Sequence, residues 1–391
     1  MKMVVLLSRI PYPLEKGDKL RAYYQIKELS KNHEIYLVAL NDAPVHPKAM
    51  SQLHPFCKEI LILNLPFWTR FIGLFYALFK GIPFQCGYFY SKKAHQKFID
   101  FVNRIQPDHI YCQIVRVVEY VIGIPYPKTL DFQDVFSKGM QRRFENAPFY
   151  TKPLFYYEYK KLIKYEQFAF SIFDHLTIIT GVDRDLIPHP EHLKIDVIPN
   201  GVDFEQYRYQ DVTKEFDLIF SGNMSYPPNI DAAEYLAKHV YPELKKEFPN
   251  ITLVICGASP TTRVTSLAGD GITVTGWVDS MADYYAKSRV FIAPMRLGTG
   301  LQNKLIEAMA MKLPCITSTL AGKPLEGIEN GRDVIICETT SGYVEAVKLL
   351  LNNQTLYQEI AENGHQFVKQ NYNWEVTTQK LENKIIMNNE K

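Results

Sequence analysis

The sequence predicts an α/β fold made of two Rossmann-like, doubly wound domains that face a central cleft. Short apolar runs rich in β-branched residues alternate with segments of helical periodicity along most of the chain. Runs that are apolar at nearly every position indicate parallel strands covered by helices on both faces. These runs form two successive series, and each series supplies enough strands for one doubly wound sheet.

The strands of the first series are expected in the order in which the apolar runs occur. They are "MVVLLS" (3–8), "HEIYLVAL" (33–40), "EILILNL" (59–65), "DHIYCQI" (108–114), "KTLDFQD" (128–134) and "HLTIIT" (175–180). The second series is expected to contain "FDLIFSG" (216–222), "ITLVICG" (251–257), "ITVTGW" (272–277), "VFIAPM" (290–295), "PCITST" (314–319) and "VIICE" (334–338). After residue 340 the pattern is helical to the end.

A turn separates the two series. Pro199-Asn200-Gly201 is a strong turn signal, and a polar stretch follows it before the next strand begins at Phe216. We therefore expect an N-terminal domain over residues 1–200 and a C-terminal domain over 201–370. Residues 371–391 are expected to form a helix that packs back on the first domain.

Composition excludes several classes of protein. The chain has 391 residues, is 47% hydrophobic and 22% charged, and carries a formal net charge of +2, so no global field favours nucleic acid. Its six cysteines are scattered without a CxxC pair, which points to a reducing compartment. No secretory signal or apolar run of about 18 residues is present. The histidines show no metal-binding spacing. We expect a cytoplasmic protein without a metal or cofactor.

The stretch 294–316, "PMRLGTGLQNKLIEAMAMKLPCI", follows a predicted strand and places a Gly-Thr-Gly turn before a helix. Ligands of open α/β sheets bind beyond the carboxyl ends of the strands, and a helix N-terminus attracts anions. Lys304 and Glu307 lie one turn apart on this helix. The lysine suits a diphosphate and the carboxylate suits ribose hydroxyls. A solvated ion pair at the protein surface is the alternative.

Other residues after strands have similar alternatives. Gly222 could allow a phosphate to approach the backbone or could only form a turn. Trp277 and Val278 could form a wall for a nucleotide base, or Trp277 could be ordinary core. Gly17 begins a helix in "EKGDKLR" (15–21).

In that helix, Arg21 could reach phosphate or acceptor, or form a solvated pair with Asp18. Asp131 and Asp134 could orient an acceptor hydroxyl or be solvated loop carboxylates.

Two segments interleave aromatic and basic residues. They are "LPFWTRFIGLFYALFKGIPF" (65–84) and "YTKPLFYYEYKKLIKYEQFAF" (150–170). Such segments can lie in a membrane interface, where a lipid-linked acceptor would be found. Helices that face the core are the alternative.

The stretch "GTGLQNKLIEAMAMKLPCI" resembles the donor-binding helix of family 4 glycosyltransferases of the GT-B fold, whose pattern is Glu-x7-Glu followed by Ala-Met-Ala and Gly-x-Pro. Further segments resemble the family in the same order: "IPYPLEKGDKLRAYYQIKELS" (10–30), "VIPNGVD" (197–203), "LIFSGNMSYPPNIDAAEYL" (218–236), "VTGWVDSMADYYAKSRVFIAPM" (274–295) and "NYNWE" (371–375). The variants "GLQNKLIEAMAM", "PPNIDA" and "KGDKLR" are most similar to sugar transferases of exosortase-type exopolysaccharide clusters.

The resemblance implies roles for individual residues. Glu307 corresponds to the second glutamate of the pattern, which holds the ribose, whereas Thr299 occupies the position of the first, which contacts the donor sugar. The family's Arg and Lys are missing from the loop after Phe216–Gly222, and we expect Arg296 and Lys304 to replace them. The expected donor-binding residues are Glu307, Gly222, Asn223, Trp277, Val278, Gly298, Thr299, Gly300, Leu301, Asn303 and Gly17. The expected catalytic residues are Arg296, Lys304 and Asp134, and the expected acceptor-side residues are Arg21 and Asp131.

The activity implied by the resemblance is transfer of a sugar, with retention, from a UDP or GDP sugar to a glycan or lipid-linked acceptor in cell-surface polysaccharide synthesis. Peripheral contact with the inner face of the membrane would fit such an acceptor. A GT-B-type nucleotide-sugar epimerase and a non-catalytic sugar-nucleotide-binding module are the alternatives.

Overall fold

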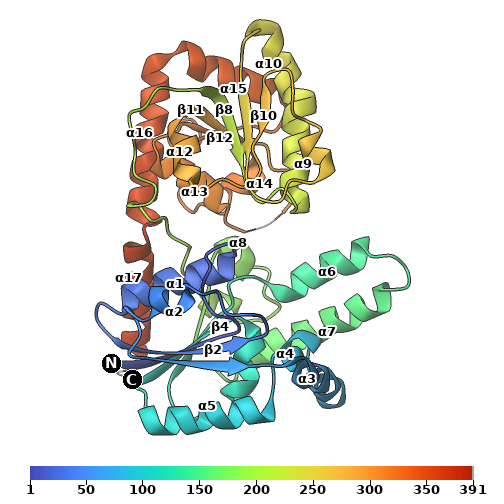
Figure 1. Cartoon of the computed structure of the whole chain (residues 1–391), viewed down its shortest axis with the longest axis vertical. Coiled ribbons are helices and arrows are strands. Elements are labelled where there is room, and N and C mark those ends of the chain that lie inside the picture. The colour runs from blue at the N-terminus through green and yellow to red at the C-terminus, as the bar shows by residue number, and fades with distance from the viewer. Residues whose placement is uncertain (299, 390–391) are drawn as a thin grey trace. The chain divides into compact units, whose positions relative to one another are not determined.

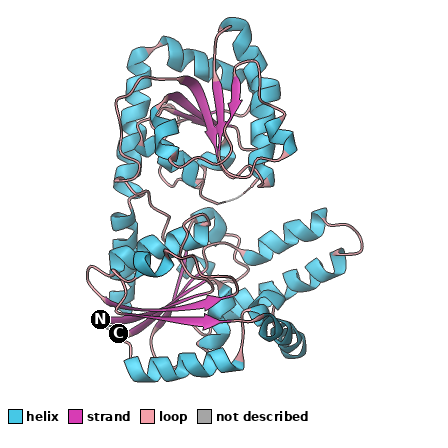
Figure 2. Ribbon diagram, viewed as in Figure 1, coloured by secondary structure: helices cyan, strands magenta, loops and turns pink. Residues whose placement is uncertain are grey.

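The computed structural model describes residues 1–298 and 300–389, with side chains to residue 387. The chain divides into two compact units. Unit 1 comprises Met1–Pro199 and Thr377–Lys391, and unit 2 comprises Asn200–Val376. Each unit is an α/β domain with one parallel sheet, and Figures 1 and 2 show the sheets with helices around them.

The sheet of unit 1 has seven strands in the order β3-β2-β1-β4-β5-β6-β7, and every neighbouring pair is parallel. The strands are β1 (Lys2–Leu7), β2 (Glu34–Asn41), β3 (Glu59–Asn64), β4 (His109–Gln113), β5 (Lys128–Asp131), β6 (His175–Ile178) and β7 (Asp196–Val197). The helices are α1 (Gly17–Leu29), α2 (Ala49–Leu53), α3 (Phe67–Lys80), α4 (Phe84–Tyr88), α5 (Lys92–Ile105), the 3₁₀ helix η1 (Val115–Tyr120), α6 (Phe136–Asn146), α7 (Lys152–Ala169), α8 (Gly181–Arg184) and the 3₁₀ turn η2 (His192–Lys194).

Both faces of this sheet are buried, as the apolar strand pattern predicts. In β1, Met3, Val5 and Leu7 belong to one core cluster, whereas Val4 and Leu6 belong to another. The first cluster also contains Ile26 of α1, together with Leu381 and Ile385 of α17 (Trp374–Asn389). Successive side chains of a strand point to opposite faces, so an apolar residue at every position requires cover on both sides.

The sheet of unit 2 has six strands in the order β10-β9-β8-β11-β12-β13, again all parallel. The strands are β8 (Phe216–Ser221), β9 (Leu253–Cys256), β10 (Ile272–Val274), β11 (Ser288–Ala293), β12 (Cys315–Thr317) and β13 (Ile335–Ile336). The helices are α9 (Pro227–Tyr235), the π-helical turn η3 (Leu236–Val240), α10 (Tyr241–Glu247), α11 (Thr262–Thr265), α12 (Met281–Ala286), α13 (Asn303–Ala310), α14 (Thr319–Gly322), α15 (Thr340–Asn352) and α16 (Gln354–Asn371).

The structure differs from the sequence-based expectation at several element boundaries and in one additional strand. The two-residue strand β7 was not expected. The run at 128–134 stops being a strand at Asp131, because Gln133 adopts a φ of 63° that no strand accommodates. Helix α13 begins at Asn303, two residues later than the pattern "LQNKLIEAMAMK" suggests. In the part of the chain that the structure describes, no helix is both long and apolar enough to cross a membrane.

Candidate functional site

Two glycine loops meet at the carboxyl edge of the sheet in unit 2. Gly222 follows β8 and Gly257 follows the neighbouring strand β9. A Cβ at Gly257 would lie 1.9 Å from the carbonyl oxygen of Gly222, and the φ of Gly257 is 143°. Only glycine permits this approach and this backbone conformation. The two loops therefore pack backbone against backbone at the edge where ligands of such sheets bind, and the side chain of Asn229 lies against Gly222.

Lys304 projects from α13 toward the first of these loops. Its ammonium donates a hydrogen bond to the side-chain oxygen of Asn229 and lies 5.2 Å from the centre of the Phe220 ring. The amide nitrogen of Asn229 in turn donates to the carbonyl oxygen of Asn223 at 2.9 Å. Asn229 thus fixes both the lysine and the loop that contains Gly222. The structure brings Gly222, Asn223 and Lys304 together, as expected of a single binding site.

Glu307 lies one turn further along α13 and is half-buried like Lys304. Its carboxylate accepts a hydrogen bond from the Tyr285 hydroxyl at 3.3 Å and another from the Tyr207 hydroxyl. The Tyr285 hydroxyl also lies 2.7 Å from that of Ser221, at the end of β8. The carboxylate is therefore held in place at the same sheet edge by tyrosines of two other segments.

The two charged groups of α13 are strongly perturbed. Burial lowers the pKa of Lys304 to about 7, although the charge of Glu307 opposes this shift. Burial also raises the pKa of Glu307 to about 7, against the opposing effect of its tyrosine hydrogen bonds and of Lys304. Among the described residues no ion pair joins Lys304 and Glu307, and each has other partners. The solvated-ion-pair alternative is therefore wrong.

The segment before α13 is tied to the rest of unit 2. Asn303 accepts a hydrogen bond at 3.2 Å from the buried side chain of Asn200. Gly298 lies against Pro228, the second residue of α9, and Leu301 packs on the core. Gly300 has a φ of 75°. Thr299, which occupies the position of the family's first glutamate, lies outside the described residues.

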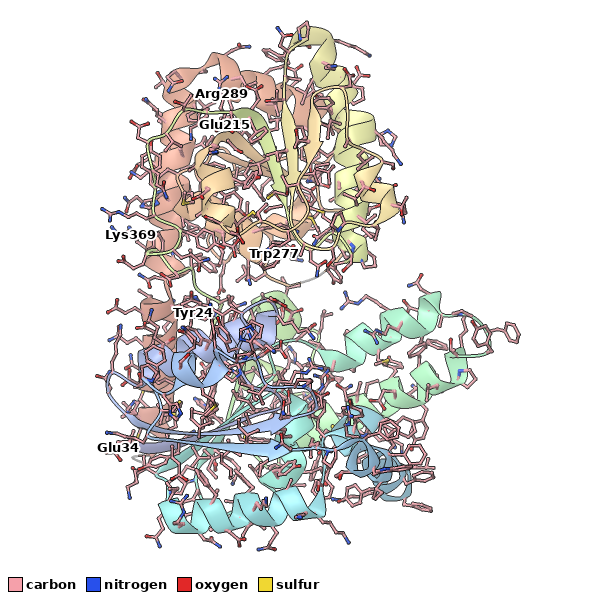
Figure 3. All side chains as sticks on the ribbon, in the orientation of Figure 1. Tyr24, Glu34, Glu215, Trp277, Arg289 and Lys369 are labelled. Carbon is pink, nitrogen blue, oxygen red and sulfur yellow. The ribbon has the colours of Figure 1, made fainter. Side chains whose placement is uncertain are left out.

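Trp277 and Val278 follow β10, at the same edge of the sheet. Trp277 is 64% exposed, and Figure 3 labels it there. Val278 is partly buried and packs against the core of unit 2. The alternative that Trp277 is ordinary core is therefore wrong, and its ring is available to stack on a planar ligand.

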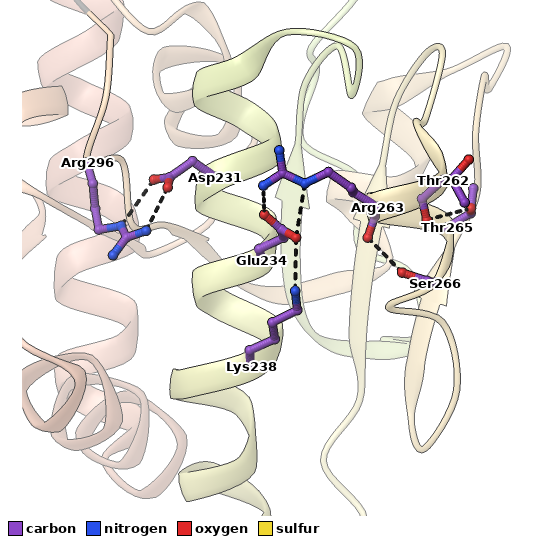
Figure 4. A network of polar contacts seen from close by, with 8 residues as sticks. All are labelled: Asp231, Glu234, Lys238, Thr262, Arg263, Thr265, Ser266 and Arg296. Atoms are coloured by element: carbon purple, nitrogen blue, oxygen red, sulfur yellow. Dashed lines mark hydrogen bonds and ion pairs between the residues drawn. The ribbon is translucent and has the colours of Figure 1, made fainter.

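Arg296 does not join the group around Lys304. Its guanidinium forms a bidentate pair with Asp231 at 3.1 and 2.6 Å (Figure 4). It also lies 4.5 Å from the centre of the Tyr235 ring. Asp231 and Asn229 are two residues apart on α9, hence about 200° apart around the helix. Arg296 and Lys304 thus bind opposite sides of α9. A paired guanidinium that points away from Lys304 contradicts the expectation that both cations replace the family's loop cations.

In unit 1, Arg21 and Asp131 form a buried pair. The Nε of Arg21 donates to Asp131 at 2.6 Å, and both side chains are fully buried. The Tyr111 hydroxyl donates to the same carboxylate at 3.1 Å. Neither group can contact an acceptor, so the acceptor-side expectation for Arg21 and Asp131 is corrected, as is the alternative of a solvated Asp18–Arg21 pair. The pair instead fastens α1 to the end of β5.

Two expected residues of unit 1 are at the surface. Gly17 is the first residue of α1, and no atom lies within 4 Å of the position of a Cβ there. Asp134 is exposed after β5, and one carboxylate oxygen accepts the backbone N–H of Val135 at 2.7 Å. Both lie beyond carboxyl ends of strands in their own unit, and their roles in donor binding and catalysis stay predictions.

Sequence reasoning missed Asn229, Tyr285 and Tyr207. A signal existed for Asn229, because it is a polar residue in the first turn of the helix that follows the Gly222 loop. No local pattern distinguishes Tyr285 from its neighbour Tyr284. In the described parts of the chain, no three His, Cys, Asp or Glu side chains gather in a way that could hold a metal ion.

Comparison with known proteins agrees with this geometry. Residues 215–353, most of unit 2, match the family model "Glycosyl transferases group 1". A curated relative, an uncharacterized 44.6 kDa protein in the cps region of Klebsiella pneumoniae, is 24% identical over 95% of this chain and 96% of its own length.

Two solved structures have the same fold over nearly the whole chain. The Anabaena protein HepE in complex with UDP-glucose is 11% identical, covers 98% of this chain and 99% of its own, and has a TM-score of 0.69. Sucrose-phosphate synthase from Thermosynechococcus elongatus is 13% identical, covers 99% of both chains and has a TM-score of 0.66. The chain thus has the two-domain GT-B fold of these solved structures, and residues 215–353 at its second sheet resemble the glycosyltransferases of group 1.

Proposed function

We propose that the chain transfers a sugar, with retention, from a nucleotide-diphosphate sugar of the UDP or GDP type to a glycan or lipid-linked acceptor. The observation that carries this proposal is the position of Lys304 and Glu307, which lie half-buried on one face of α13 beside the Gly222 loop. Neither charge is neutralised by the other, so each can bind an external group of opposite polarity in addition to its present hydrogen-bond partners.

The chemistry of each group fits one part of such a donor. The Lys304 ammonium, beside the loop that contains Gly222 and Asn223, suits the diphosphate. The Glu307 carboxylate suits the ribose hydroxyls, and the exposed Trp277 ring suits the base. HepE, which shares the fold, was solved in complex with UDP-glucose, and this supports a nucleotide-sugar donor here.

The reaction would depend mainly on electrostatics. As the bond between the sugar and the diphosphate breaks, negative charge develops on the departing oxygen, and a positioned cation in a partly dry site stabilises it. Lys304 supplies that cation. Arg296 is not assigned this role, because Asp231 already neutralises it. Retention follows from the family resemblance.

A role in cell-surface polysaccharide synthesis is supported by the relative from the cps region of Klebsiella pneumoniae. We also propose that the chain is cytoplasmic and binds the inner face of an anionic membrane through unit 1. One side of α3 is unusually apolar for a surface, and its exposed residues are Phe67, Trp68, Phe71, Ile72, Phe75, Leu78 and Phe79.

The neighbouring helical hairpin, formed by α6 and α7, is basic, and this charge favours an anionic membrane as the partner. The basic residues of α6 and α7 are Lys138, Arg142, Arg143, Lys152, Lys160, Lys161 and Lys164. The acidic residues of these helices are Glu145, Glu158 and Glu166, of which the last two are buried. An apolar face beside a basic one matches the acyl region and the headgroups of an anionic leaflet.

The donor assignment is tested by calorimetric titration of UDP, GDP and ADP into the wild type and Glu307→Ala. We expect micromolar binding of one nucleotide and a loss of at least tenfold in the variant. The exposed Glu345→Ala serves as the matched control and should bind like the wild type. If no nucleotide binds, or if Glu307→Ala binds normally, the proposed donor site is wrong. Transfer to an acceptor, followed by NMR of the anomeric configuration, then tests catalysis and retention.

A further inference from the structure

Unit 1 contains a pocket whose lining residues all belong to this unit. It has a volume of about 470 Å³ and opens among α3, α4, α6 and α7. Its walls are mainly apolar and include Leu74, Phe84, Phe89, Met140, Leu154 and Phe155. Pockets of about 300–1,000 Å³ with apolar walls and a few polar groups are typical of sites for small organic ligands.

Two arginines provide most of the charge in this pocket. Arg9 follows β1, and Arg116 belongs to η1, which follows the adjacent strand β4. Their guanidinium carbons lie 5.8 and 5.4 Å from the centre of the same ring, that of Phe89. The pocket therefore has a cationic end at the carboxyl edge of the sheet, where ligands of doubly wound sheets bind.

The charge of Arg116 is only weakly compensated. Its Nε donates to the neutral side chain of Gln85 at 3.1 Å, and no ion pair involves it among the residues that the structure describes. Burial, and next the nearby charge of Arg9, lower the pKa of Arg116. Arg9 itself has a partner, Asp18, at 3.7 Å. Two neighbouring cations with so little compensation favour the binding of an anion between them.

Glu158 is the carboxylate in the wall, and its hydrogen bonds are directed elsewhere. It accepts the backbone N–H groups of Phe84 and Gln85 at 2.6 and 3.2 Å, and the side-chain amide of Gln85 at 3.3 Å. These contacts hold the first turn of α4. The carboxylate is thus committed to the N-terminus of a helix, and the arginines keep their capacity to bind an external anion.

The apolar wall continues to the exposed side of α3. Leu74 lies on α3 between the exposed Phe71 and Phe75, and Leu154 in the wall is itself 53% exposed. Figure 1 shows α3, α4 and α7 close together in unit 1. Apolar wall residues from α3, α4 and α7 therefore connect the exposed face of α3 with the pocket that holds the arginines.

We propose that this pocket binds a lipid phosphate, with the hydrocarbon chain between α3, α4 and α7 and the phosphate at Arg9 and Arg116. The assignment deepens the proposed function by making the acceptor lipid-linked. It rests on the proposed function in one respect: the bound lipid is an acceptor only if the chain transfers a sugar. Binding of the lipid itself depends on unit 1 and can be measured without any donor.

The test is calorimetric titration of farnesyl phosphate into the full chain, with farnesol and inorganic phosphate as separate ligands. We expect farnesyl phosphate to bind at least tenfold more tightly than either fragment. Arg9→Gln and Arg116→Gln should each weaken it at least tenfold. Arg104→Gln is the control, because Arg104 is an exposed arginine on α5 paired with Glu59, and it should change nothing. Arg9 is partly exposed, so its variant is informative even if Arg116→Gln unfolds.

Each result that contradicts the lipid-phosphate proposal has a single interpretation. Equal binding of phosphate would make the site an anion site without lipid, and equal binding of farnesol would remove the role of the arginines. Normal binding by Arg9→Gln, or no binding by the wild type, would also overturn the proposal. The nucleotide titration remains independent: intact nucleotide binding with failed lipid binding rejects this pocket alone, whereas the reverse result rejects the donor site alone.

Discussion

Lys304 and Glu307 titrate in the same pH range because burial lowers the pKa of the lysine and raises that of the glutamate. Each has a pKa of about 7, so near neutrality the two exchange protons with solvent and influence one another. A donor diphosphate requires Lys304 protonated, whereas ribose hydroxyls are bound best by ionised Glu307. A lower pH favours protonated Lys304 but disfavours ionised Glu307, and a higher pH has the reverse effect.

We therefore predict that donor affinity has a maximum near pH 7. Above the pKa of Lys304 the cation is lost, and below the pKa of Glu307 the carboxylate is lost, so affinity falls toward tenfold per pH unit on each side. The measurement is calorimetry with the intact nucleotide sugar that binds, UDP-glucose or GDP-mannose, since its diphosphate does not titrate in this range.

Three variants identify the groups responsible for the pH dependence of donor affinity. Glu307→Gln should abolish the fall on the acidic side, and Lys304→Arg should abolish the fall on the alkaline side because arginine stays protonated. The exposed Lys323→Arg should retain both limbs. A wild-type affinity that is constant between pH 6 and pH 8 would contradict the assignment.

Residues of the site differ in how well the sequence predicts them. Lys304 and Glu307 lie within one helical turn, so their proximity follows from local geometry alone. Asn229 and Tyr285 meet them only because the sheet of unit 2 brings α9 and α12 beside α13. Arg21 and Asp131 are 110 positions apart, and their burial depends on packing that no local pattern contains. Sequence reasoning therefore misassigned residues whose partners lie far away in the sequence.

At the scale of elements, two glycines allow α3 and α4 to pack closely. A Cβ on Gly73 would lie 2.0 Å from the carbonyl oxygen of Gly87, and a Cβ on Gly87 would lie 2.3 Å from that of Gly73. Both residues are buried. The helix with the exposed apolar face is thus attached to unit 1 through a backbone-to-backbone contact.

We predict that Gly73→Ala separates these helices and destabilises unit 1 by about 2–4 kcal/mol, since the clash is with backbone that cannot rotate away. Gly139→Ala on α6 is the matched control: no atom lies within 4 Å of its Cβ position, and alanine favours a helix by roughly 0.5–1 kcal/mol. Calorimetric unfolding of both variants is the measurement. Equal melting temperatures would show that the close contact does not restrain α3.

The elements themselves were largely predictable. All twelve expected strands occur, because a buried parallel strand is apolar on both faces and such runs are easily recognised. Strand β7 was missed because two residues carry no periodicity. The aromatic segment 65–84 left two alternatives open, and the structure places one side of α3 in solvent. Composition alone cannot decide that point, since a core helix and an interfacial helix have similar residues.

At the scale of the whole molecule, the proposed membrane contact depends on the exposed side of α3. We predict that the full chain sediments with vesicles containing phosphatidylglycerol and less well with neutral phosphatidylcholine vesicles. The tryptophan emission of the wild type should shift to shorter wavelength on binding, because Trp68 is 73% exposed in the free protein.

Variants distinguish membrane binding through α3 from nonspecific adsorption to vesicles. Phe75→Ser together with Phe79→Ser should abolish sedimentation, and Trp68→Phe should sediment but lose most of the spectral shift. Leu349→Ser on α15 of unit 2 is the control, because Leu349 is an apolar residue about as exposed as Phe75. Sedimentation that survives the double variant would exclude α3 as the membrane-binding element.

Leu381 and Ile385 complete the core around β1, although they are separated from it by all of unit 2 in the sequence. During synthesis on the ribosome, the residues of unit 2 therefore emerge before the cover over Met3, Val5 and Leu7, to which α1 also contributes, can be completed. Unit 2 can fold first, while unit 1 keeps apolar surface exposed until α17 has been synthesised. A nascent chain stalled before residue 377 would be a target for chaperones, even though all seven strands of its first sheet had already been made.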